Sequence, residues 1–393
     1  MTYREDFTLP AELMERVSQE GFDILPELIQ AIINAAMQAE RQQYLNAEPY
    51  QHSEERQGHG NGFKPKTVHT RVGNITFAIP QVREGGFYPE ALEKGLRSER
   101  ALLLALAEMY VQGVSTRKVK AVTEKLCGVT LSSTQVSHAA ALMDTELEKW
   151  RNRPLGEYPY LFVDAHYEQV REDGQVRDLA VLSAVGVNLL GKREILPAPV
   201  PQVQVGVSVA LSEHEVHWRA FLESLKARGL GGVRLITSDD HAGLKAARLA
   251  VFGGIPWQRC QFHLQQNAQA YVPHKDMLGE VAADIHTIFN APDRATAETY
   301  LANSVQKYQK TASRLAEWMA ANIPEGLTVF SFPAEHRRLL RTTNGVDRLH
   351  REVRRRARVV SIFPNPASCL RLVSAVLSEI SDEWLTGRIY LTF

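Results

Sequence analysis

The chain has 393 residues, of which 44% are hydrophobic and 23% are charged, so its composition is that of a globular protein with room for two or three domains. Lysine plus arginine and aspartate plus glutamate each occur 45 times, and this zero net charge excludes a whole-chain electrostatic argument for a nucleic-acid partner. Three cysteines exclude a disulfide framework, and because neither a secretory signal nor an apolar run of about 18 residues is present, we expect a cytoplasmic protein without a membrane span.

Residues 1–48 are predicted to form an N-terminal helical dimerisation segment. From Pro10 to Leu45, apolar side chains such as Ile24 and Met37 recur near one face of a helix. Such a stripe is typical of a buried core face or of a contact between two copies of a chain.

Residues 49–97 are predicted to form a basic β-ribbon that follows a mobile leader. The leader is rich in Gly, His and Arg, and two strand-like runs follow it, TVHTRV and ITFAIPQV, with Gly73-Asn74 as the joint between them. Lys64 and Lys66 are the candidate DNA contacts of this ribbon.

Residues 98–152 have the helix signals of a helix-turn-helix DNA-binding domain. Ser115 is placed to cap one helix, Gly128 to end it, and Ser132 or Ser133 to cap the next. Short polar side chains at the start of that last helix suit a DNA groove, although a plain helical bundle explains the same signals. The candidate DNA contacts here are Arg117, Lys118 and Gln135.

Alternating sheet and helix is predicted for residues 153–264. Three successive strand-like runs are linked by short turns, which favours antiparallel pairing. A helix capped by Ser212 and ended by Gly229 follows, and the next strand is then expected to lie parallel to the first. This mixed α/β sheet places Asp164 and Asp239 on neighbouring strands.

The chain beyond this sheet is predicted to be helical. Ala-rich sequence in residues 265–335 indicates a helical insertion, and residues 336–393 are expected to supply C-terminal helices that complete the core. The insertion therefore separates the acids of the sheet from any acid on the last helices.

Two acids are expected at the edge of the sheet. Asp164 ends the apolar run YLFV, and Asp239 follows the apolar run VRLIT. A turn or a helix cap explains a single acid of this kind. Because Asp239 and Asp240 are adjacent, one of them can cap the next helix while the other binds a metal.

A third acid opens an arginine-rich helix. Asn344 is placed to cap this helix, which puts Asp347 at the third helical position, where a capping box also explains the residue. Glu352 is the alternative third acid, but it lies about 140° around the helix from Asp347, and ion pairing with Arg348 and Arg356 explains it. The arginines expected to hold phosphate are Arg348, Arg351, Arg354 and Arg355.

Acids delivered in this way indicate metal-dependent chemistry on a phosphodiester. Two cations held by carboxylates can activate a water or a terminal hydroxyl and stabilise the leaving oxygen, and hard oxygen ligands favour Mg²⁺, with Mn²⁺ as a substitute. Cys260 and His263 form a C-x-x-H pair, but no second pair lies at zinc-finger spacing. We therefore expect Cys260 to pack at a strand end and His263 to lie near the metal site or to contact DNA. His166 and His241, beside the two strand acids, could assist proton transfer.

Several sequence blocks occur together in a fixed order. They include GFKPKTVHTRVG, FVDAHYEQVRE, TSDDHAGL, QRCQFHLQQN and TTNGVDRLHREVRRRARVVSIFPN. Over residues 60–385 these blocks resemble the Mutator-like transposases of bacterial insertion sequences. The resemblance implies an RNase H-like catalytic fold with a DDE-type acid triad and a helical insertion before the last acid. On this chain the triad falls on Asp164, Asp239 and Asp347.

The chain departs from the family pattern at the third acid. The family usually has glutamate followed by arginine and, two residues further on, asparagine, where this sequence has Asp347, Arg348 and His350. Aspartate is one methylene shorter than glutamate, and a metal can often accept either carboxylate.

The sequence therefore predicts a DNA transposase that binds the terminal inverted repeats of an insertion sequence. It is expected to act as a homodimer or higher oligomer on DNA and to cut a strand so that the exposed 3′-hydroxyl attacks another phosphodiester. Two alternatives stay open. One is an inactive DNA-binding relic, for which the aspartate at position 347 is the only sequence support, and the other is a metal-dependent nuclease that releases its cut ends.

Overall fold

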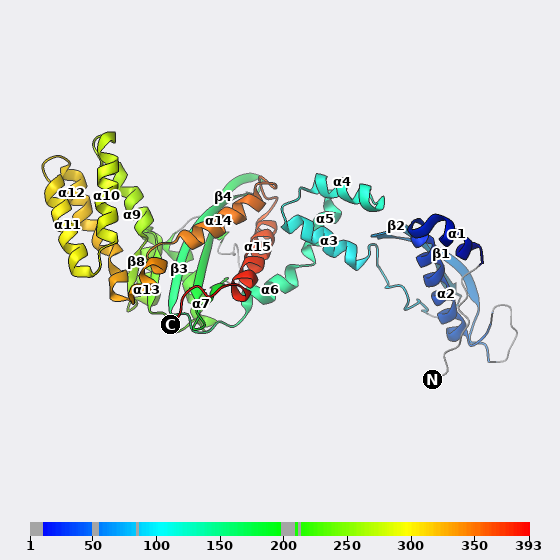
Figure 1. Cartoon of the computed structure of the whole chain (residues 1–393). Coiled ribbons are helices and arrows are strands. Elements are labelled where there is room, and N and C mark those ends of the chain that lie inside the picture. Colours follow the sequence, from blue (N-terminus) through cyan, green and yellow to red (C-terminus); the bar gives the residue numbers. More distant parts are fainter. Residues whose placement is uncertain (1–10, 49–54, 84–85, 198–208, 211–213) are drawn as a thin grey trace. The chain divides into compact units, whose positions relative to one another are not determined.

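The computed structural model of the chain describes residues 11–48, 55–83, 86–197, 209–210 and 214–393. The chain divides into two compact units, Met1–Leu142 and Met143–Phe393 (Figure 1). Among the described residues, no helix combines the length and the apolar character needed to cross a bilayer.

The first unit begins with helices that pack on a two-stranded ribbon. Its elements are α1 (Ala11–Glu20), the 3₁₀ turn η1 (Gly21–Ile24), α2 (Leu25–Leu45), β1 (Gly60–Thr70) and β2 (Gly73–Val82). Met37 of α2 is fully buried against Val68, Ile75 and Phe77 of the ribbon. The predicted helical segment is thus confirmed from Ala11 onward, and its apolar face covers the ribbon.

The ribbon turns two residues earlier than the sequence predicts. β1 and β2 are antiparallel with Thr70 opposite Gly73, so the loop is Arg71-Val72 and Gly73 already belongs to β2. The Thr70 hydroxyl donates to the Gly73 carbonyl at 2.7 Å, and a φ of 120° at Gly73 allows the tight return. Much of the predicted leader, at 49–54, lies outside the described residues.

Three short helices complete the first unit. They are α3 (Arg100–Val111), α4 (Thr116–Cys127) and α5 (Ser133–Ala141). Ser115 begins α4 by accepting a hydrogen bond from the Lys118 amide at 3.3 Å, and Gly128, with a φ of 63°, ends it. Ser132 begins α5 through a capping box with Gln135. The helix signals predicted from the sequence are therefore confirmed.

The last helix of the predicted segment 98–152 belongs to the second unit. This helix, α6 (Asp144–Asn152), packs against α15 (Pro366–Thr386). The Asp144 carboxylate accepts two hydrogen bonds from Arg371, at 2.7 and 2.6 Å. The segment that was predicted as one DNA-binding domain is thus divided between the two units.

A mixed sheet forms the centre of the second unit. Its strands are β3 (Tyr160–Glu172), β4 (Gln175–Val187), β5 (Arg193–Ile195), β6 (Val209–Ala210), β7 (Leu235–Ser238) and β8 (Trp257–Arg259). The order is β5-β4-β3-β7-β8, and β6 also pairs with β4. Strands β3, β4 and β5 are antiparallel, whereas β7 is parallel to β3 and β8 is parallel to β7. The predicted mixed α/β sheet is confirmed, while the short strand β6 was not predicted.

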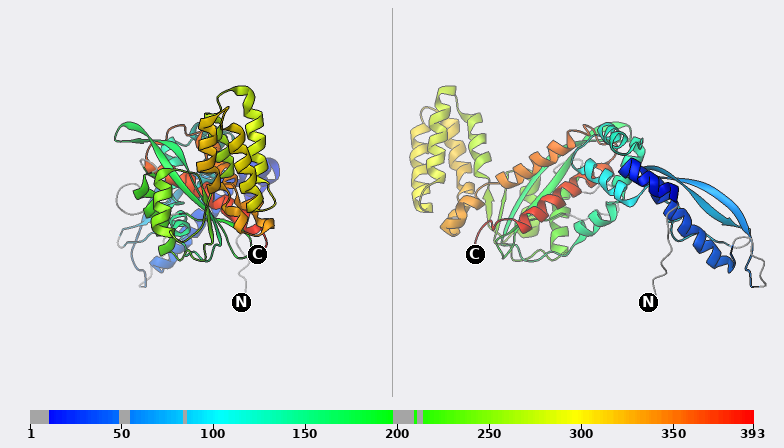
Figure 2. Two further views of the ribbon diagram at one scale, coloured as in Figure 1. Left: turned by 90° about the vertical axis from the view of Figure 1, so that its left-hand side faces the viewer. Right: turned by 45° about the vertical axis from the view of Figure 1, so that its right-hand side comes forward.

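Helices cover both faces of this sheet (Figure 2). They are α7 (Glu215–Ala227) and α8 (Ala242–Phe252) on one face, and α14 (Asn344–Ala357) and α15 on the other. Successive side chains of β3 point to opposite faces. Leu161 and Val163 therefore join a core with Trp218 of α7, whereas the His166 ring contacts that of His350 of α14.

Two helix starts differ from the prediction. Ser212 lies outside the described residues, and α7 begins after His214, whose side chain makes no cap hydrogen bond. Helix α14 begins at Asn344, one residue earlier than predicted, because the carbonyl of the buried Thr343 accepts the first helical amides. Asp347 is consequently the fourth helical residue, and the capping-box explanation for it fails.

The region between β8 and α14 is helical, as predicted. It contains α9 (Gln261–Ala268), α10 (Leu278–Phe289), α11 (Arg294–Tyr308), α12 (Ser313–Asn322), α13 (Ala334–Leu340) and the 3₁₀ turns η2 (Gln269–Tyr271), η3 (Lys275–Met277), η4 (Ile323–Gly326) and η5 (Thr328–Ser331). The buried Gln258 of β8 donates to the Gly326 carbonyl at 2.9 Å and accepts the Val329 amide at 2.9 Å. Gln261 donates to the same Gly326 carbonyl at 2.8 Å, so side-chain amides anchor this region to the sheet.

Candidate active site

Asp164 and Asp239 lie at the same edge of the sheet. Where β7 runs parallel to β3, the last residue pair is Val163 opposite Ser238. Asp164 is the next residue of β3, and Asp239 is the first residue after β7. Asp164 was predicted to end its own strand, but β3 continues to Glu172. Asp164 instead lies level with the end of the neighbouring strand.

The charges of these two acids act on the carboxylate of Asp347, which comes from α14. Burial and, after it, the charge of Asp239 raise the pKa of Asp164 to about 7. Burial, together with the charges of Asp164 and Asp239, raises the pKa of Asp347 to about 6. Three carboxylates from separate segments of the chain therefore lie close enough to repel one another, which is an arrangement that a bound cation relieves.

A hollow of about 260 Å³ opens beside two of these acids. Asp164, Asp239 and His263 line it, together with His241. His241 is the N-cap residue of α8, and its side chain makes no cap hydrogen bond. Neither Asp239 nor Asp240 caps this helix, so the helix-cap explanation for the two adjacent acids fails.

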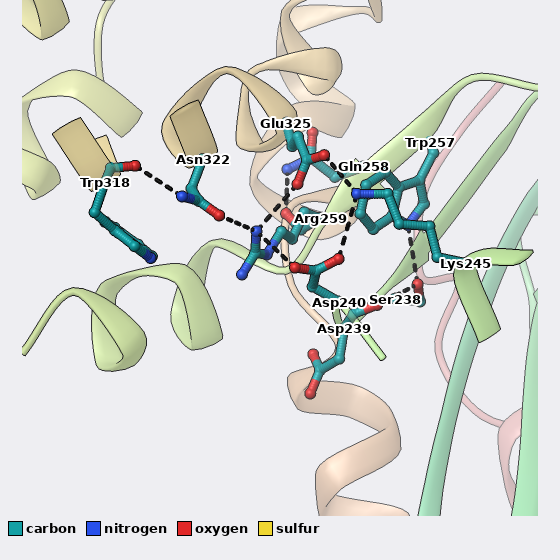
Figure 3. A network of polar contacts seen from close by, with 10 residues as sticks. All are labelled: Ser238, Asp239, Asp240, Lys245, Trp257, Gln258, Arg259, Trp318, Asn322 and Glu325. Atoms are coloured by element: carbon teal, nitrogen blue, oxygen red, sulfur yellow. Dashed lines mark hydrogen bonds and ion pairs between the residues drawn. The ribbon is translucent and has the colours of Figure 1, made fainter. Parts of the chain in front are cut away.

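The adjacent acids Asp239 and Asp240 have different surroundings (Figure 3). Asp240 lies in a closed network, with its carboxylate 3.0 Å from Nη1 of the buried Arg259 and 3.4 Å from Nζ of Lys245. Both cations also contact Glu325 of η4, at 3.0 and 2.7 Å. Both acids line the hollow, but the Asp239 side chain points out of this network.

Cys260 and His263 lie beside Asp239. His263 Nδ1 is 2.5 Å from Asp239 Oδ1, and this contact, together with Cys260, raises the pKa of the imidazole to about 11. Cys260 follows β8 directly, is fully buried, and accepts weak hydrogen bonds from the amide and hydroxyl of Thr343, both at 3.4 Å. One possible ligand atom from each of Asp239, Cys260 and His263 lies within 4.8 Å of the others. Because sulfur and nitrogen ligands suit zinc better than magnesium, this trio is an alternative place for a metal.

The sequence patterns gave no role to His350, yet it contacts Asp164. Its Nδ1 lies 3.2 Å from Asp164 Oδ2, and its ring centroid lies 4.3 Å from that of His166. Burial lowers the pKa of His350 to about 3 and that of His166 to about 4, so both imidazoles are neutral near pH 7. A neutral imidazole can donate from Nδ1 and thereby orient the Asp164 carboxylate. The sequence signal that could have indicated this role is the position of His350 three residues after Asp347, on the same side of the helix.

Glu352, the alternative third acid, is engaged in ion pairs on α14. It accepts hydrogen bonds from Arg355 at 2.8 and 2.6 Å and from Arg356 at 3.0 Å, and these bonds lower its pKa to about 2. Arg356 was a predicted partner, but Arg355 takes the place predicted for Arg348. Arg348 lies instead near Tyr390, on whose phenol its charge acts.

Two other arginines of α14 lie near the acids. The charge of Arg351 partly opposes the rise in the pKa of Asp347, and the charge of Arg354 partly opposes the rise in that of Asp164. Both arginine side chains are exposed. The structure thus separates the four predicted phosphate contacts, placing Arg351 and Arg354 beside the carboxylates and pairing Arg355 with Glu352.

Comparison with known proteins identifies the family. The family model described as "Transposase, Mutator family" matches residues 2–387. The chain belongs to the Mutator family of transposases. Its relatives include the transposase for insertion sequence element IS406 of Burkholderia multivorans, which is 56% identical over 377 residues and 95% of each chain. The transposase for ISRM5 of Rhizobium meliloti is 41% identical over 94% of this chain and 90% of its own. The transposase for IS256 in transposon Tn4001 of Staphylococcus aureus is 34% identical over 98% of both.

In the first unit of this transposase, the predicted DNA contacts have different surroundings. Arg117 and Lys118 are exposed in the first turn of α4, and Lys64 is exposed on β1. The Gln135 side chain instead accepts hydrogen bonds from the N-cap residue of α5, at 2.8 and 3.0 Å. Lys66 donates to a tyrosine hydroxyl at 2.9 Å and to a backbone carbonyl at 3.0 Å. Gln135 and Lys66 therefore have hydrogen-bond partners within the first unit, and all five residues stay predicted DNA contacts.

Proposed function

We propose that this transposase binds the terminal inverted repeats of its own insertion sequence and catalyses metal-dependent DNA strand cleavage and strand transfer. The observation that carries the proposal is the gathering of Asp164, Asp239 and Asp347 from two strands and a helix. Their charges act on one another, and the pKa values of Asp164 and Asp347 are raised. Asp164 and Asp239 line a hollow, and perturbed carboxylates beside a hollow are typical of a catalytic site.

The architecture supports an RNase H-like catalytic core of the DDE type. Three antiparallel strands are followed by two parallel ones, and a helical region separates the second strand acid from the helix with the third acid. This is the order that the resemblance to Mutator-like transposases implies.

We assign Mg²⁺, with Mn²⁺ as a substitute and two ions per site, to the three acids. Their carboxylate oxygens are the hard ligands that these cations prefer. A bound cation would also relieve the electrostatic repulsion among the three acids. When bound, the cations would activate a water or a 3′-hydroxyl and stabilise the leaving oxygen. Cys260 and His263 are softer donors, and we give them the supporting role of positioning Asp239.

Other side chains would position the substrate and the acids. Arg351 and Arg354 offer exposed guanidinium groups next to the carboxylates, where they can bind the oxygens of a phosphodiester. His350 would hold the Asp164 carboxylate in one orientation. We assign recognition of the DNA ends to the first unit, with two copies or more of the chain on the DNA.

A strand-transfer assay tests the proposal. Pre-cut inverted-repeat ends of the parent element are incubated with a target plasmid, Mg²⁺ or Mn²⁺, and the wild type, Asp347→Ala or Glu352→Ala. We expect joined product from the wild type and from Glu352→Ala, and none from Asp347→Ala although it still binds the ends.

The other outcomes would change either the third ligand or the function. Loss of product with Glu352→Ala alone would move the third ligand to that residue. End binding by the wild type without joined product indicates a DNA-binding relic, and cut ends that are released without joining indicate a nuclease.

A further inference from the structure

A second basic site lies at the base of the helical region, next to α13. A hollow of about 480 Å³ is bounded there by the end of α10, by η5 and by α13. Arg337, Arg338 and Arg341 line it, and none of the described residues that line it is acidic. Three positive charges thus face one hollow without a carboxylate among them.

Uncharged acceptors hold two of these arginines in place. Arg337 donates to the carbonyls of Phe332 and Pro292, both at 2.9 Å, and Arg341 donates to the side-chain oxygen of Asn290 at 2.9 Å. Carbonyl and amide oxygens orient a guanidinium group but leave its charge uncompensated. These bonds explain why the two side chains are ordered, and they leave the positive charge of the hollow intact.

The acid next to Pro292 in the sequence is already engaged elsewhere. Asp293 is the N-cap residue of α11 and accepts the Thr296 amide at 2.8 Å. Its pKa is lowered chiefly by that backbone hydrogen bond, and the charge of Arg337 is a lesser cause. Asp293 therefore serves the helix and does not line the hollow.

Arg338 differs from the two arginines beside it in the hollow. It is exposed and makes no hydrogen bond or ion pair with another described residue. Its charge nevertheless reaches Arg341, whose pKa is lowered by burial and then by Arg338. Two guanidinium groups that repel one another at a hollow are relieved when an anion binds between them.

The end of α13 is tied to the edge of the sheet that bears the acids. The Leu340 carbonyl accepts the Thr237 hydroxyl of β7 at 2.8 Å, and the Arg341 carbonyl accepts the Gln261 amide at 3.0 Å. Six residues lead from Arg341 to Asp347, so the two Cα atoms are at most roughly 20 Å apart. A nucleic-acid strand covers that length in roughly six nucleotides.

We propose that Arg337, Arg338 and Arg341 form a phosphate-binding pocket for the backbone of the DNA strand that occupies the active site. The chain length between Arg341 and Asp347 puts this phosphate on the order of six nucleotides from the reacting phosphodiester. Planar guanidinium groups match the oxygens of a phosphate and carry no base specificity, so the pocket fixes the path of the strand and not its sequence. The inference rests on the proposed function, because a strand lies in this site only if the chain acts on DNA.

The test compares exposed arginines whose loss leaves the fold intact. Binding of a labelled inverted-repeat duplex to the full chain is measured by fluorescence anisotropy over a salt series, with Ca²⁺ in place of Mg²⁺ to prevent cutting. Arg338→Glu is expected to weaken binding about tenfold, and Arg338→Ala to reduce the slope of log affinity against log salt by about 0.9. Arg314→Glu is the matched control, because Arg314 is an exposed residue of α12 that does not line the hollow.

A second measurement locates the phosphate. Single methylphosphonates, which lack the negative charge, are placed along the strand on both sides of the cleavage position. One substitution should weaken binding of the wild type and have no further effect on Arg338→Ala. If Arg338→Glu binds like Arg314→Glu while both join DNA ends, the pocket is wrong and the proposed function stands. If the wild type binds no DNA, both are wrong.

Discussion

At the scale of single residues, Asp240 has a cation at each carboxylate oxygen, whereas Asp239 beside it contacts the His263 imidazole. Of these cations, Arg259 is only 4% exposed, so leaving its charge unpaired would destabilise the fold. Asp240 and Glu325 share that guanidinium group. Residue spacing left both aspartates open and the family resemblance selected Asp239, but neither could reveal the partners of Asp240, because Glu325 lies far along the chain.

Asp347→Asn should stabilise the protein in the absence of metal. Burial, Asp164 and Asp239 raise the pKa of Asp347 above its unfolded value, so its ionised form destabilises the folded chain at pH 7. The neutral amide removes that repulsion and also removes a ligand. Calorimetry without metal should give a higher Tm for the variant, and added Mg²⁺ should then raise the Tm of the wild type more.

Glu352→Gln is the control for this prediction. It removes a carboxylate with a lowered pKa from an ion-pair cluster, so its Tm should not rise. Its response to Mg²⁺ should match that of the wild type. An equal Mg²⁺ shift in Asp347→Asn would show that Asp347 does not hold the ion.

The structure shows side-chain contacts of several residues that sequence patterns could not predict. Gln135 and Lys66 were predicted as DNA contacts, and the structure adds that their side chains also make hydrogen bonds within the first unit. Thr343, and not Asn344, is the N-cap residue of α14, and its side chain contacts the distant Cys260 and makes no cap hydrogen bond. Spacing along the chain predicts which face of a helix a residue occupies. It does not predict which residue far along the chain contacts that side chain.

At the scale of elements, local sequence signals were sufficient to predict where a helix begins when residues next to it in the sequence cap it. The capping box of α5 is such a case, and it predicts the effect of two serine substitutions. Ser132→Ala should lower the free energy of unfolding by about 1 kcal/mol, because the side-chain acceptor of the helix start is lost. Ser137→Ala, on the exposed face of the same helix, should change it by no more than a few tenths of a kcal/mol. Urea unfolding measures both, and equal effects would contradict a capping role.

The anchoring of the helical region to the sheet predicts opposite effects for two glycines. A Cβ on Gly326 would lie 2.6 Å from Leu264 Cδ1 and 3.2 Å from the Phe289 ring, so Gly326→Ala should destabilise the chain by about 1–3 kcal/mol. Gly279 in α10 has no atom within 4 Å of that position. Gly279→Ala should therefore stabilise the chain by about 0.5–1 kcal/mol. Thermal unfolding that shows the same sign for both would contradict the close packing at Gly326.

At the scale of the whole molecule, hydrophobic periodicity and turn signals predicted the mixed sheet and its parallel strand pair. The long apolar runs of β3 and β4 made that possible, because buried strands of that length have a strong pattern. The boundary between the two units was not predicted. Helix α6 continues the helical sequence of the first unit, and its packing against α15 depends on a contact with Arg371 that no local pattern reveals.

The central claim is that Asp164, Asp239 and Asp347 together hold the catalytic cations. Fe²⁺ in place of Mg²⁺, with ascorbate and peroxide, cuts a protein backbone next to the bound metal, and the fragments can be mapped. We predict cuts near all three acids, suppressed by excess Mg²⁺, lost in Asp347→Ala and kept in Glu352→Ala. Cuts confined to Asp239 and the Cys260–His263 segment would contradict the claim and assign the metal to that trio.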